Sequence, residues 1–206
     1  MAQITKQEAM QILAFRKERE KYRYFTPNGK TEQFIKLVGK GEVFISLLSA
    51  ANGVGKTACG ANIAAHLMYP CSCEYFNYPI YKNFPFEKKG RIVSDPTTIS
   101  KQIIPELKKW FPFSRYQTTN ESKNFESKWL TDTGFEFDLM TYEQDPKEFE
   151  SVTLGWAWFD EPPPQEIYKA TVSRMRKGGI IYITQTPLKG SAWLYDSFIT
   201  SKDRIL

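Results

Sequence analysis

The sequence predicts an α/β fold in which helices flank a central, mainly parallel β-sheet. Three observations support this prediction. Apolar runs of strand length alternate with helical patterns along the 206 residues, and this alternation is typical of sheets built from strand–helix–strand units. The length suits one domain of this class. Apolar residues make up 41% of the chain, which is enough to fill one such core.

The first half of the chain surrounds a glycine-containing loop. A nearly continuous apolar run just before this loop is typical of a strand covered on both faces, and the helix that the loop opens follows directly. Residues 69–90, rich in Tyr, Phe, Pro and Cys, predict an irregular insertion whose aromatic side chains pack against the core, with contact to a partner as the alternative. The predicted elements are an amphipathic helix over 5–24, a short helix around Phe34, a strand over 42–49 and a helix over 56–68.

The second half continues the alternation of strands and helices. A pattern of alternating residues around Thr133 and Gly134 predicts a β-hairpin. The run Pro162–Pro164 separates the next strand from the helix after it. The predicted elements are a strand over 91–96, a helix over 97–110, the hairpin over 127–141, a strand over 154–159, a helix over 165–176 and a strand over 180–184.

Charge and hydropathy exclude few classes of protein. Lysine and arginine outnumber aspartate and glutamate by 28 to 23. This mild excess allows a polyanionic partner but is equally explained as a contribution to solubility. No uninterrupted apolar run approaches the roughly 20 residues that a membrane-spanning helix needs, so we expect no membrane partner.

The cysteines indicate a reducing, intracellular setting. Their number is odd, and charged residues interrupt the first apolar positions, so no signal peptide is predicted. Cys71 and Cys73 have the proximity of a metal-binding pair. A second pair is missing and His66 is the only histidine, so the sequence argues against a zinc site.

The loop Ala50–Thr57 matches the phosphate-loop pattern except that alanine stands at the first glycine position. Gly53 and Gly55 let backbone N–H groups turn toward phosphate oxygens at a helix N-terminus. Lys56 is expected to neutralise the β- and γ-phosphates, and Thr57 to offer its hydroxyl to Mg²⁺. A mere turn with a solvated lysine is the alternative, which the flanking strand and helix disfavour. The predicted nucleotide contacts are Ala51, Asn52, Gly53, Val54, Gly55, Lys56, Thr57 and Ala58.

Asp160 and Glu161 end an apolar strand, at the edge where an open α/β sheet binds ligands. We expect Asp160 to hold the metal and Glu161 to act as the general base toward the attacking water. The alternative is an acidic pair that merely complements a helix N-terminus. The last strand ends in Thr184–Pro187, whose hydroxyl and amide groups suit sensing of the γ-phosphate. An ordinary strand-ending turn is the alternative there.

With these pieces in order, the chain resembles the ATPase domain of a large terminase subunit, the DNA-packaging motor protein of tailed bacteriophages. The resemblance covers about residues 25–195. It implies the P-loop NTPase fold of the ASCE type. It rests on residues 50–57 as Walker A, 154–161 as Walker B and 184–187 as the motif that couples hydrolysis to movement. Further similar strings are Thr141–Gln144, Phe149–Ser151 and Trp158–Pro163.

The resemblance also implies the cofactors and further site residues. These are ATP, Mg²⁺, an adenine contact at Gln33, whose amide can both donate and accept, and a coupling role for Thr184. A surface glutamine is the alternative for Gln33. Some relatives place an arginine just before Walker B, whereas residues 149–151 have none. We therefore expect Arg174 to supply the cation of the transition state, with Arg176 or a lysine as alternatives.

The resemblance further implies how the protein is organised. Residues 1–40 form an N-terminal helical segment with the adenine-contacting region, 41–195 the ATPase core and 196–206 the start of a linker or lid. Large terminases also have a nuclease domain, so we expect either that this chain is an excised ATPase domain or that the nuclease is a separate polypeptide. The implied partners are double-stranded DNA, a portal protein, a small terminase subunit, that nuclease domain and further copies in a ring. The implied location is the cytoplasm of the infected bacterial host.

Two other functions fit the same motifs. One is a helicase-like ATPase stimulated by nucleic acid, which single-stranded DNA would activate. The other is a nucleotide-gated binding module, in which ATP only sets a conformation. Glu161 argues against the second, because a binding module needs no general base.

Overall fold

The computed structural model describes residues 5–120, 124–150, 152–187 and 192–200. In this part of the chain, seven strands form one sheet in the order β1-β7-β6-β2-β5-β4-β3. The first five strands of that order are parallel, and β4 and β3 extend the sheet antiparallel. The strands are β1 Ile45–Ser49, β2 Lys89–Ser94, β3 Tyr116–Thr119, β4 Lys128–Thr131, β5 Glu136–Thr141, β6 Trp156–Asp160 and β7 Ile180–Gln185.

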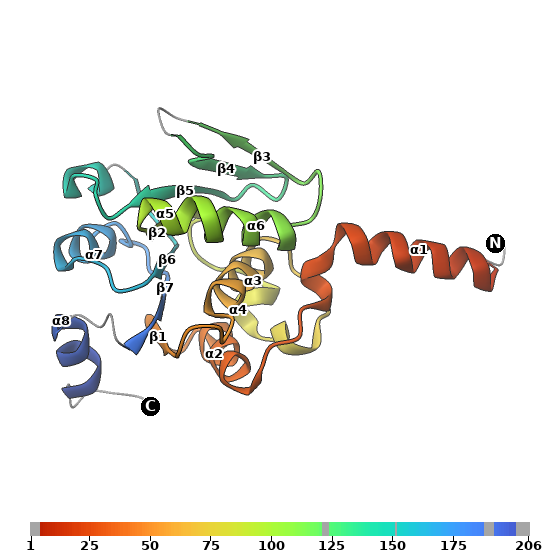
Figure 1. Cartoon of the computed structure of the whole chain (residues 1–206), viewed down its shortest axis with the longest axis horizontal. Coiled ribbons are helices and arrows are strands. Elements are labelled where there is room, and N and C mark those ends of the chain that lie inside the picture. Colours follow the sequence, from red (N-terminus) through yellow and green to blue (C-terminus); the bar gives the residue numbers. More distant parts are fainter. Residues whose placement is uncertain (1–4, 121–123, 151, 188–191, 201–206) are drawn as a thin grey trace.

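Helices cover both faces of the sheet, and each face has its own hydrophobic core (Figure 1). On one face lie α2, α3, α4 and α6, and on the other α7 and α8. The helices are α1 Lys6–Arg19, α2 Gly29–Lys40, α3 Lys56–Met68, α4 Pro79–Lys82, α5 Pro96–Thr98, α6 Ile104–Trp110, α7 Gln165–Val172 and α8 Ala192–Tyr195. A π-helical turn, η3 Ile99–Ile103, joins α5 to α6.

Strand β6 shows how one apolar run serves two cores. All five of its residues are buried, and successive side chains point to opposite faces. Trp156 and Trp158 therefore join the core under α3, whereas Ala157 and Phe159 join the core under α7. Helix α3 approaches this strand closely at Gly60, where a Cβ atom would lie 2.2 Å from Cζ2 of Trp158.

Most of the predicted elements are confirmed, including α3 over residues 56–68 and the β4–β5 hairpin. The prediction that the first strand is covered on both faces is confirmed for one face, where Ser46 and Leu48 are buried, and was wrong for the other, where Ile45 and Leu47 are only half-buried. Strand β1 is an edge strand that pairs with β7. Strand β3 was not predicted because its sequence, Tyr-Gln-Thr-Thr, has no apolar run. In the insertion 69–90, the side chains of Phe76, Ile80 and Tyr81 are buried in the core, as predicted.

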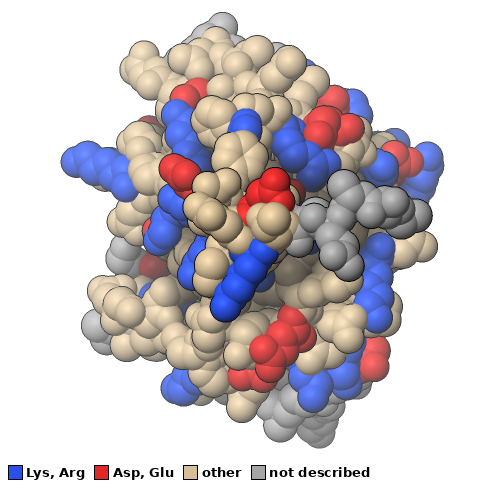
Figure 2. Space-filling model, turned by 90° about the vertical axis from the view of Figure 1, so that its right-hand side faces the viewer, with Lys and Arg blue, Asp and Glu red and all other residues tan. Residues whose placement is uncertain are grey.

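The helix predicted over residues 5–24 is confirmed only in part, because α1 ends at Arg19 and a separate 3-10 helix, Lys21–Tyr24, follows it. The prediction that this helix is amphipathic was wrong, since no face of α1 packs against the domain. It extends away from the domain (Figure 1) and buries none of its residues. The side chains of Met10, Ile12, Leu13 and Phe15 are 55–61% exposed. Figure 2 looks onto the end of the molecule from which α1 projects. Basic and acidic side chains are interspersed on this face, without a continuous basic stripe among the described residues. None of the described helices is long and apolar enough to cross a membrane.

Candidate nucleotide-binding site

The loop between β1 and α3 has the backbone geometry that phosphate binding requires. Gly53 and Gly55 have φ angles of 80° and 82°, a region that favours glycine. Gly55 is the N-cap of α3, and no side chain caps the helix by hydrogen bonding. The N–H groups of its first turn are thus available to an anion, where the helix dipole also favours negative charge.

Two side chains hold this loop in shape. The ammonium group of Lys56 is nearly buried and donates to the carbonyl oxygens of Ala50 and Ala51, at 2.9 and 3.1 Å. From the other side, the amide of Asn28, the N-cap of α2, donates to the carbonyl of Val54 at 2.8 Å. The segment before α2 therefore contacts the phosphate loop through Asn28, which sequence reasoning had missed.

Asp160 ends β6 directly beside the first turn of α3. Its side chain is 3% exposed. It accepts hydrogen bonds from the hydroxyls of Thr57, at 3.3 Å, and Thr184, at 2.5 Å. Burial raises the pKa of Asp160 to about 6, and the hydrogen bond from Thr184 opposes that rise. The structure thus brings together the two residues predicted to hold the metal, which are 103 positions apart in the chain.

The backbone at Glu161 adopts a conformation that is unusual for a residue with a side chain. Its φ angle is 67°, in the left-handed region that L-residues rarely occupy. The hydroxyl of Tyr142 donates to the carbonyls of Asp160 and Glu161, at 3.2 and 2.7 Å. Ser94 also donates to the Asp160 carbonyl, at 2.9 Å. These bonds fix the turn that aims the Glu161 carboxylate.

Both carboxylate oxygens of Glu161 are bound by Thr186. The Thr186 hydroxyl lies 2.8 Å from Oε1, and its backbone N–H donates to Oε2 at 3.0 Å. The same hydroxyl lies 3.0 Å from Oδ1 of Asn52 in the phosphate loop. Thr186 therefore links the end of β7 to the proposed general base and to the loop. The sequence placed Thr186 in the coupling motif without identifying these contacts.

A pocket of about 620 Å³ opens where these groups meet, which is within the usual range of ligand sites. Glu161, Asp160 and the loop form one wall, and η3 with α6 forms the other. Lys101 lines the pocket from η3, a π-helical turn of the kind often found at functional sites. This second cation of the pocket was missed because a lysine on an exposed helix has no sequence signature. The lining residues are Asn52, Gly53, Gly55, Lys56, Thr57, Ala58, Thr98, Lys101, Gln102, Pro105, Glu106, Asp160 and Glu161.

Five of the residues predicted for the site lie outside the lining of this pocket: Ala51 and Val54 of the loop, and Thr184, Gln33 and Arg174. Thr184 is fully buried, and its hydroxyl donates to Asp160 while accepting from the indole N–H of Trp158 at 2.8 Å. It positions Asp160 and has no hydrogen left for a phosphate. Gln33 is exposed and lines a different hollow, beside the edge strand β1, so its contact with adenine stays a prediction.

Arg174 lies at the opposite end of the sheet from the pocket. Its guanidinium donates to the carbonyl of Glu150 at 2.7 Å, and its own carbonyl accepts from the N–H of Leu154, ahead of β6. From Leu154 to Asp160 an extended chain covers roughly 20 Å. Arg174 therefore cannot reach the nucleotide of its own chain. Ser151, in the string 149–151 that lacks the expected arginine, lies outside the described residues.

Two solved structures resemble the fold of this chain. The large terminase of bacteriophage HK97 matches 87% of the chain with a TM-score of 0.63 and 16% sequence identity. The large terminase of a thermophilic bacteriophage, solved in complex with ADP, matches 81% with a TM-score of 0.53 and 13% identity. The chain shares the fold of the part of each terminase that it matches. It spans 38% of the length of each of these terminases. No protein-family model and no curated protein matches the sequence significantly.

The terminase comparison confirms the predicted fold class, a mainly parallel sheet flanked by helices with a phosphate loop after β1. At these identities the likeness concerns the fold alone. The chemical argument for the pocket therefore depends on the contacts of Lys56, Thr57, Asp160 and Glu161 in this chain.

Proposed function

We propose that this chain is the ATP-hydrolysing motor domain of a viral DNA-packaging terminase. It couples Mg²⁺-dependent hydrolysis of ATP to translocation of double-stranded DNA into a procapsid. The observation that carries the proposal is the contact between the Thr57 hydroxyl and the Asp160 carboxylate, with Glu161 adjacent in the same pocket. Hydrolysis of a nucleoside triphosphate requires a phosphate loop, a set of metal ligands and a general base.

The donor set fits Mg²⁺. This ion prefers oxygen ligands and is usually held by one or two protein groups, with phosphates and water completing its shell. The Thr57 hydroxyl and the Asp160 carboxylate supply two oxygen atoms 3.3 Å apart. When bound, the ion neutralises negative charge on the β- and γ-phosphate oxygens. The hydroxyl of Thr184 holds the Asp160 carboxylate in the orientation that this role needs.

The other residues act on the phosphates and on the attacking water. The Lys56 ammonium, bound to the Ala50 and Ala51 carbonyls in this structure, turns to the phosphates when nucleotide enters. Glu161 accepts a proton from the water that attacks the γ-phosphate. Thr186 keeps the Glu161 carboxylate in place. Lys101 is a second cation, besides Lys56, that this chain contributes to its own pocket, and Arg174 serves the pocket of a neighbouring copy in a ring.

The proposal is tested by phosphate release and ATP binding of wild type, Glu161→Ala and a control, Glu166→Ala. Glu166 is an exposed carboxylate on α7, so its loss should leave turnover unchanged. Loss of a general base typically costs about 10² to 10⁴ in rate. We expect such a loss of kcat for Glu161→Ala with ATP binding retained. Equal rates in wild type and Glu161→Ala would exclude the catalytic role of Glu161.

The motor part of the proposal extends to partners. Double-stranded DNA is bound through its phosphates without sequence readout, and the portal protein, the small terminase subunit and a nuclease domain complete the assembly. Turnover should rise with intact duplex DNA, and this stimulation should fall steeply with salt. Stimulation by single strands with strand separation would instead indicate a helicase-like ATPase. Binding of ATP without any turnover would indicate a nucleotide-gated module.

A further inference from the structure

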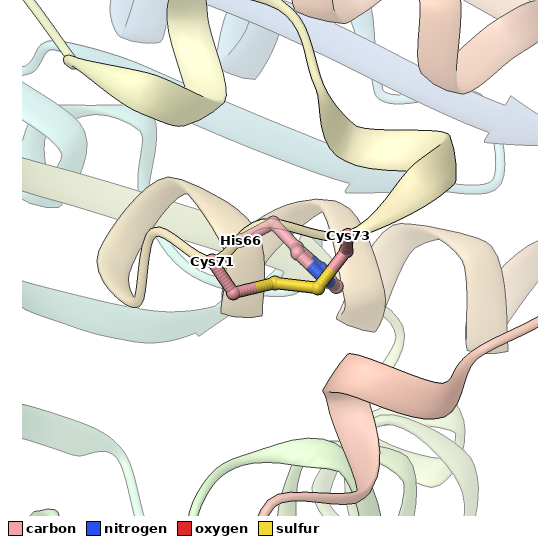
Figure 3. A group of neighbouring side chains, drawn as sticks. All are labelled: His66, Cys71 and Cys73. Carbon is pink, nitrogen blue, oxygen red and sulfur yellow. A yellow bond between two sulfur atoms is a disulfide. The ribbon is translucent and has the colours of Figure 1, made fainter.

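A second cluster of reactive side chains lies at the other end of α3 from the phosphate loop. His66 belongs to the last turn of α3, and Cys71 and Cys73 lie on the segment that follows the helix (Figure 3). A ring nitrogen of His66 and the two Sγ atoms all lie within 4.8 Å of one another. In the structure the two cysteines form a disulfide. The imidazole is fully buried and both cysteines are half-buried.

The imidazole of His66 has one nitrogen without a partner. Its Nδ1 atom lies 2.8 Å from the carbonyl oxygen of Asn62. Because a carbonyl oxygen only accepts, Nδ1 carries the hydrogen and Nε2 carries a lone pair. Nε2 is buried and has no hydrogen-bond partner among the described residues. A histidine whose Nδ1–H donates to a backbone carbonyl is in the tautomer that ligates metal through Nε2.

Aromatic rings fix the orientation of this imidazole. The ring of Phe76 is stacked on it, with centroids 3.4 Å apart and planes inclined by 3°. The ring of Tyr22 meets it edge-on with centroids 5.1 Å apart. The orientation of the His66 ring is therefore fixed by packing before any ion binds, which reduces the entropy lost on binding.

We propose that His66, Cys71 and Cys73 bind one Zn²⁺ ion when the two cysteines are reduced. Thiolate sulfur and imidazole nitrogen are the ligands that Zn²⁺ prefers. Two thiolates and a neutral imidazole balance the charge of the ion, so the half-buried site carries no net charge. In a tetrahedral site with Zn–S distances near 2.3 Å, the sulfur atoms lie ~3.8 Å apart. A Cα–Cα distance of 5.5 Å between the cysteines is compatible with that separation, and water completes the coordination.

The disulfide and the zinc complex are alternative states of the same two sulfur atoms. A dithiol reductant transfers two electrons and two protons to the disulfide, which becomes two thiols, while the reductant forms its own disulfide. Each thiol releases its proton when its sulfur binds Zn²⁺. In either state, Cys71 and Cys73 constrain the chain just after α3. Only the zinc state also joins this segment to His66.

The first test uses cobalt as a spectroscopic substitute for zinc. The protein is reduced with a phosphine, freed of metal with a chelator and titrated with Co²⁺ and then Zn²⁺. We expect one equivalent to bind with a thiolate-to-cobalt charge-transfer band, which Zn²⁺ abolishes. Cys71→Ser and Cys73→Ser should each lose more than about tenfold in affinity, since even residues behind the ligands contribute that much. Ser72→Ala, between the two cysteines, is the matched control and should bind like wild type.

The second test follows the imidazole without a mutation. His66 is the only histidine in the sequence, so untagged protein gives one pair of imidazole ¹⁵N resonances. Zn²⁺ should shift the Nε2 resonance of reduced protein and leave oxidised protein unchanged. Absence of the cobalt band in the reduced wild-type protein would overturn the proposal, and Cys71 and Cys73 would then serve only as a disulfide. An unshifted Nε2 resonance in the metal-bound protein would overturn the role of His66. Neither readout depends on ATP hydrolysis, so the proposed motor function and the zinc site can fail independently.

Discussion

The two ends of helix α3 are built in opposite ways. At the N-terminal end, glycines replace capping side chains, and the ammonium of Lys56 donates to two carbonyls of its own loop. This end is polar and opens into a pocket. At the C-terminal end, the rings of Tyr22 and Phe76 surround His66. The first end can rearrange around an incoming anion, whereas the second has its geometry fixed by packing. One helix thus connects an adaptable site to a rigid one.

The largest expected effect comes from removing the charge at the open end. Lys56→Ala should weaken binding of MgATP about 10- to 100-fold, because hydrogen bonds to charged groups contribute ~1.5–3 kcal/mol. Calorimetric titration measures this change. Lys82→Ala, at the end of the neighbouring helix α4 and exposed, is the control and should bind MgATP normally. Unchanged affinity in Lys56→Ala would exclude the phosphate-loop interpretation.

A substitution in the middle of α3 should affect the packing of the helix as a whole. In Gly60→Ala the new Cβ atom would lie 2.2 Å from Trp158, which forces the helix away from β6. We expect a loss of about 1–3 kcal/mol in the free energy of unfolding, measured by denaturant titration. Gly29→Ala is the matched control, since a Cβ at that helix position has no neighbour within 4 Å. Equal stability of the two variants would contradict the close contact between α3 and β6.

The buried carboxylate of Asp160, at the open end of α3, should lower the free energy of unfolding of the protein at pH values where it is ionised. Burial raises the pKa of Asp160 from 3.8 to about 6. The folded state therefore binds a proton more tightly than the unfolded chain, and the cost of ionisation develops as pH rises from about 4 to 6. Without metal or nucleotide, Asp160→Asn should be more stable than wild type at pH 8 by on the order of 1–2 kcal/mol. That gain should vanish near pH 4.

Thermal unfolding over a pH series measures this difference. Asp132→Asn is the control, because Asp132 is an exposed carboxylate paired with Arg115 and such pairs contribute less than about 1 kcal/mol. A constant stability difference between Asp160→Asn and wild type across the pH range would show that the Asp160 carboxylate does not titrate in this way.

The smallest effect is expected at Thr186, which binds Glu161 twice. Thr186→Val removes the hydroxyl bond and keeps the bond from the backbone N–H. One neutral hydrogen bond contributes about 0.5–1.5 kcal/mol. We therefore expect kcat to fall about 2- to 10-fold with little change in the KM for ATP. Steady-state kinetics separates the two parameters, and a change confined to KM would show that Thr186 acts on binding instead of on Glu161.

Local sequence was sufficient to predict the open end of α3. Glycines at fixed offsets, a lysine and a threonine at a helix start and two carboxylates after an apolar strand each have a short-range signature. The loop, the bounds of α3 and the meeting of Thr57 with Asp160 were predicted for this reason. The last of these also required the rule that parallel strands end at one edge of the sheet.

The tertiary structure alone decided the contacts that depend on which elements are neighbours. The pairing of β6 with β7 brings Thr186 onto Glu161, and the path of η3 brings Lys101 into the pocket. Arg174 was predicted from the sequence to supply the cation of the transition state, but the fold places it at the end of the sheet opposite the pocket. The sequence argued against a zinc site because a second cysteine pair is missing and His66 is the only histidine, whereas the fold brings His66, Cys71 and Cys73 within 4.8 Å of one another, and the proposed zinc site starts from this proximity. Which side chains meet depends on which helices and strands pack against one another, and the spacing of residues in the sequence does not specify that packing.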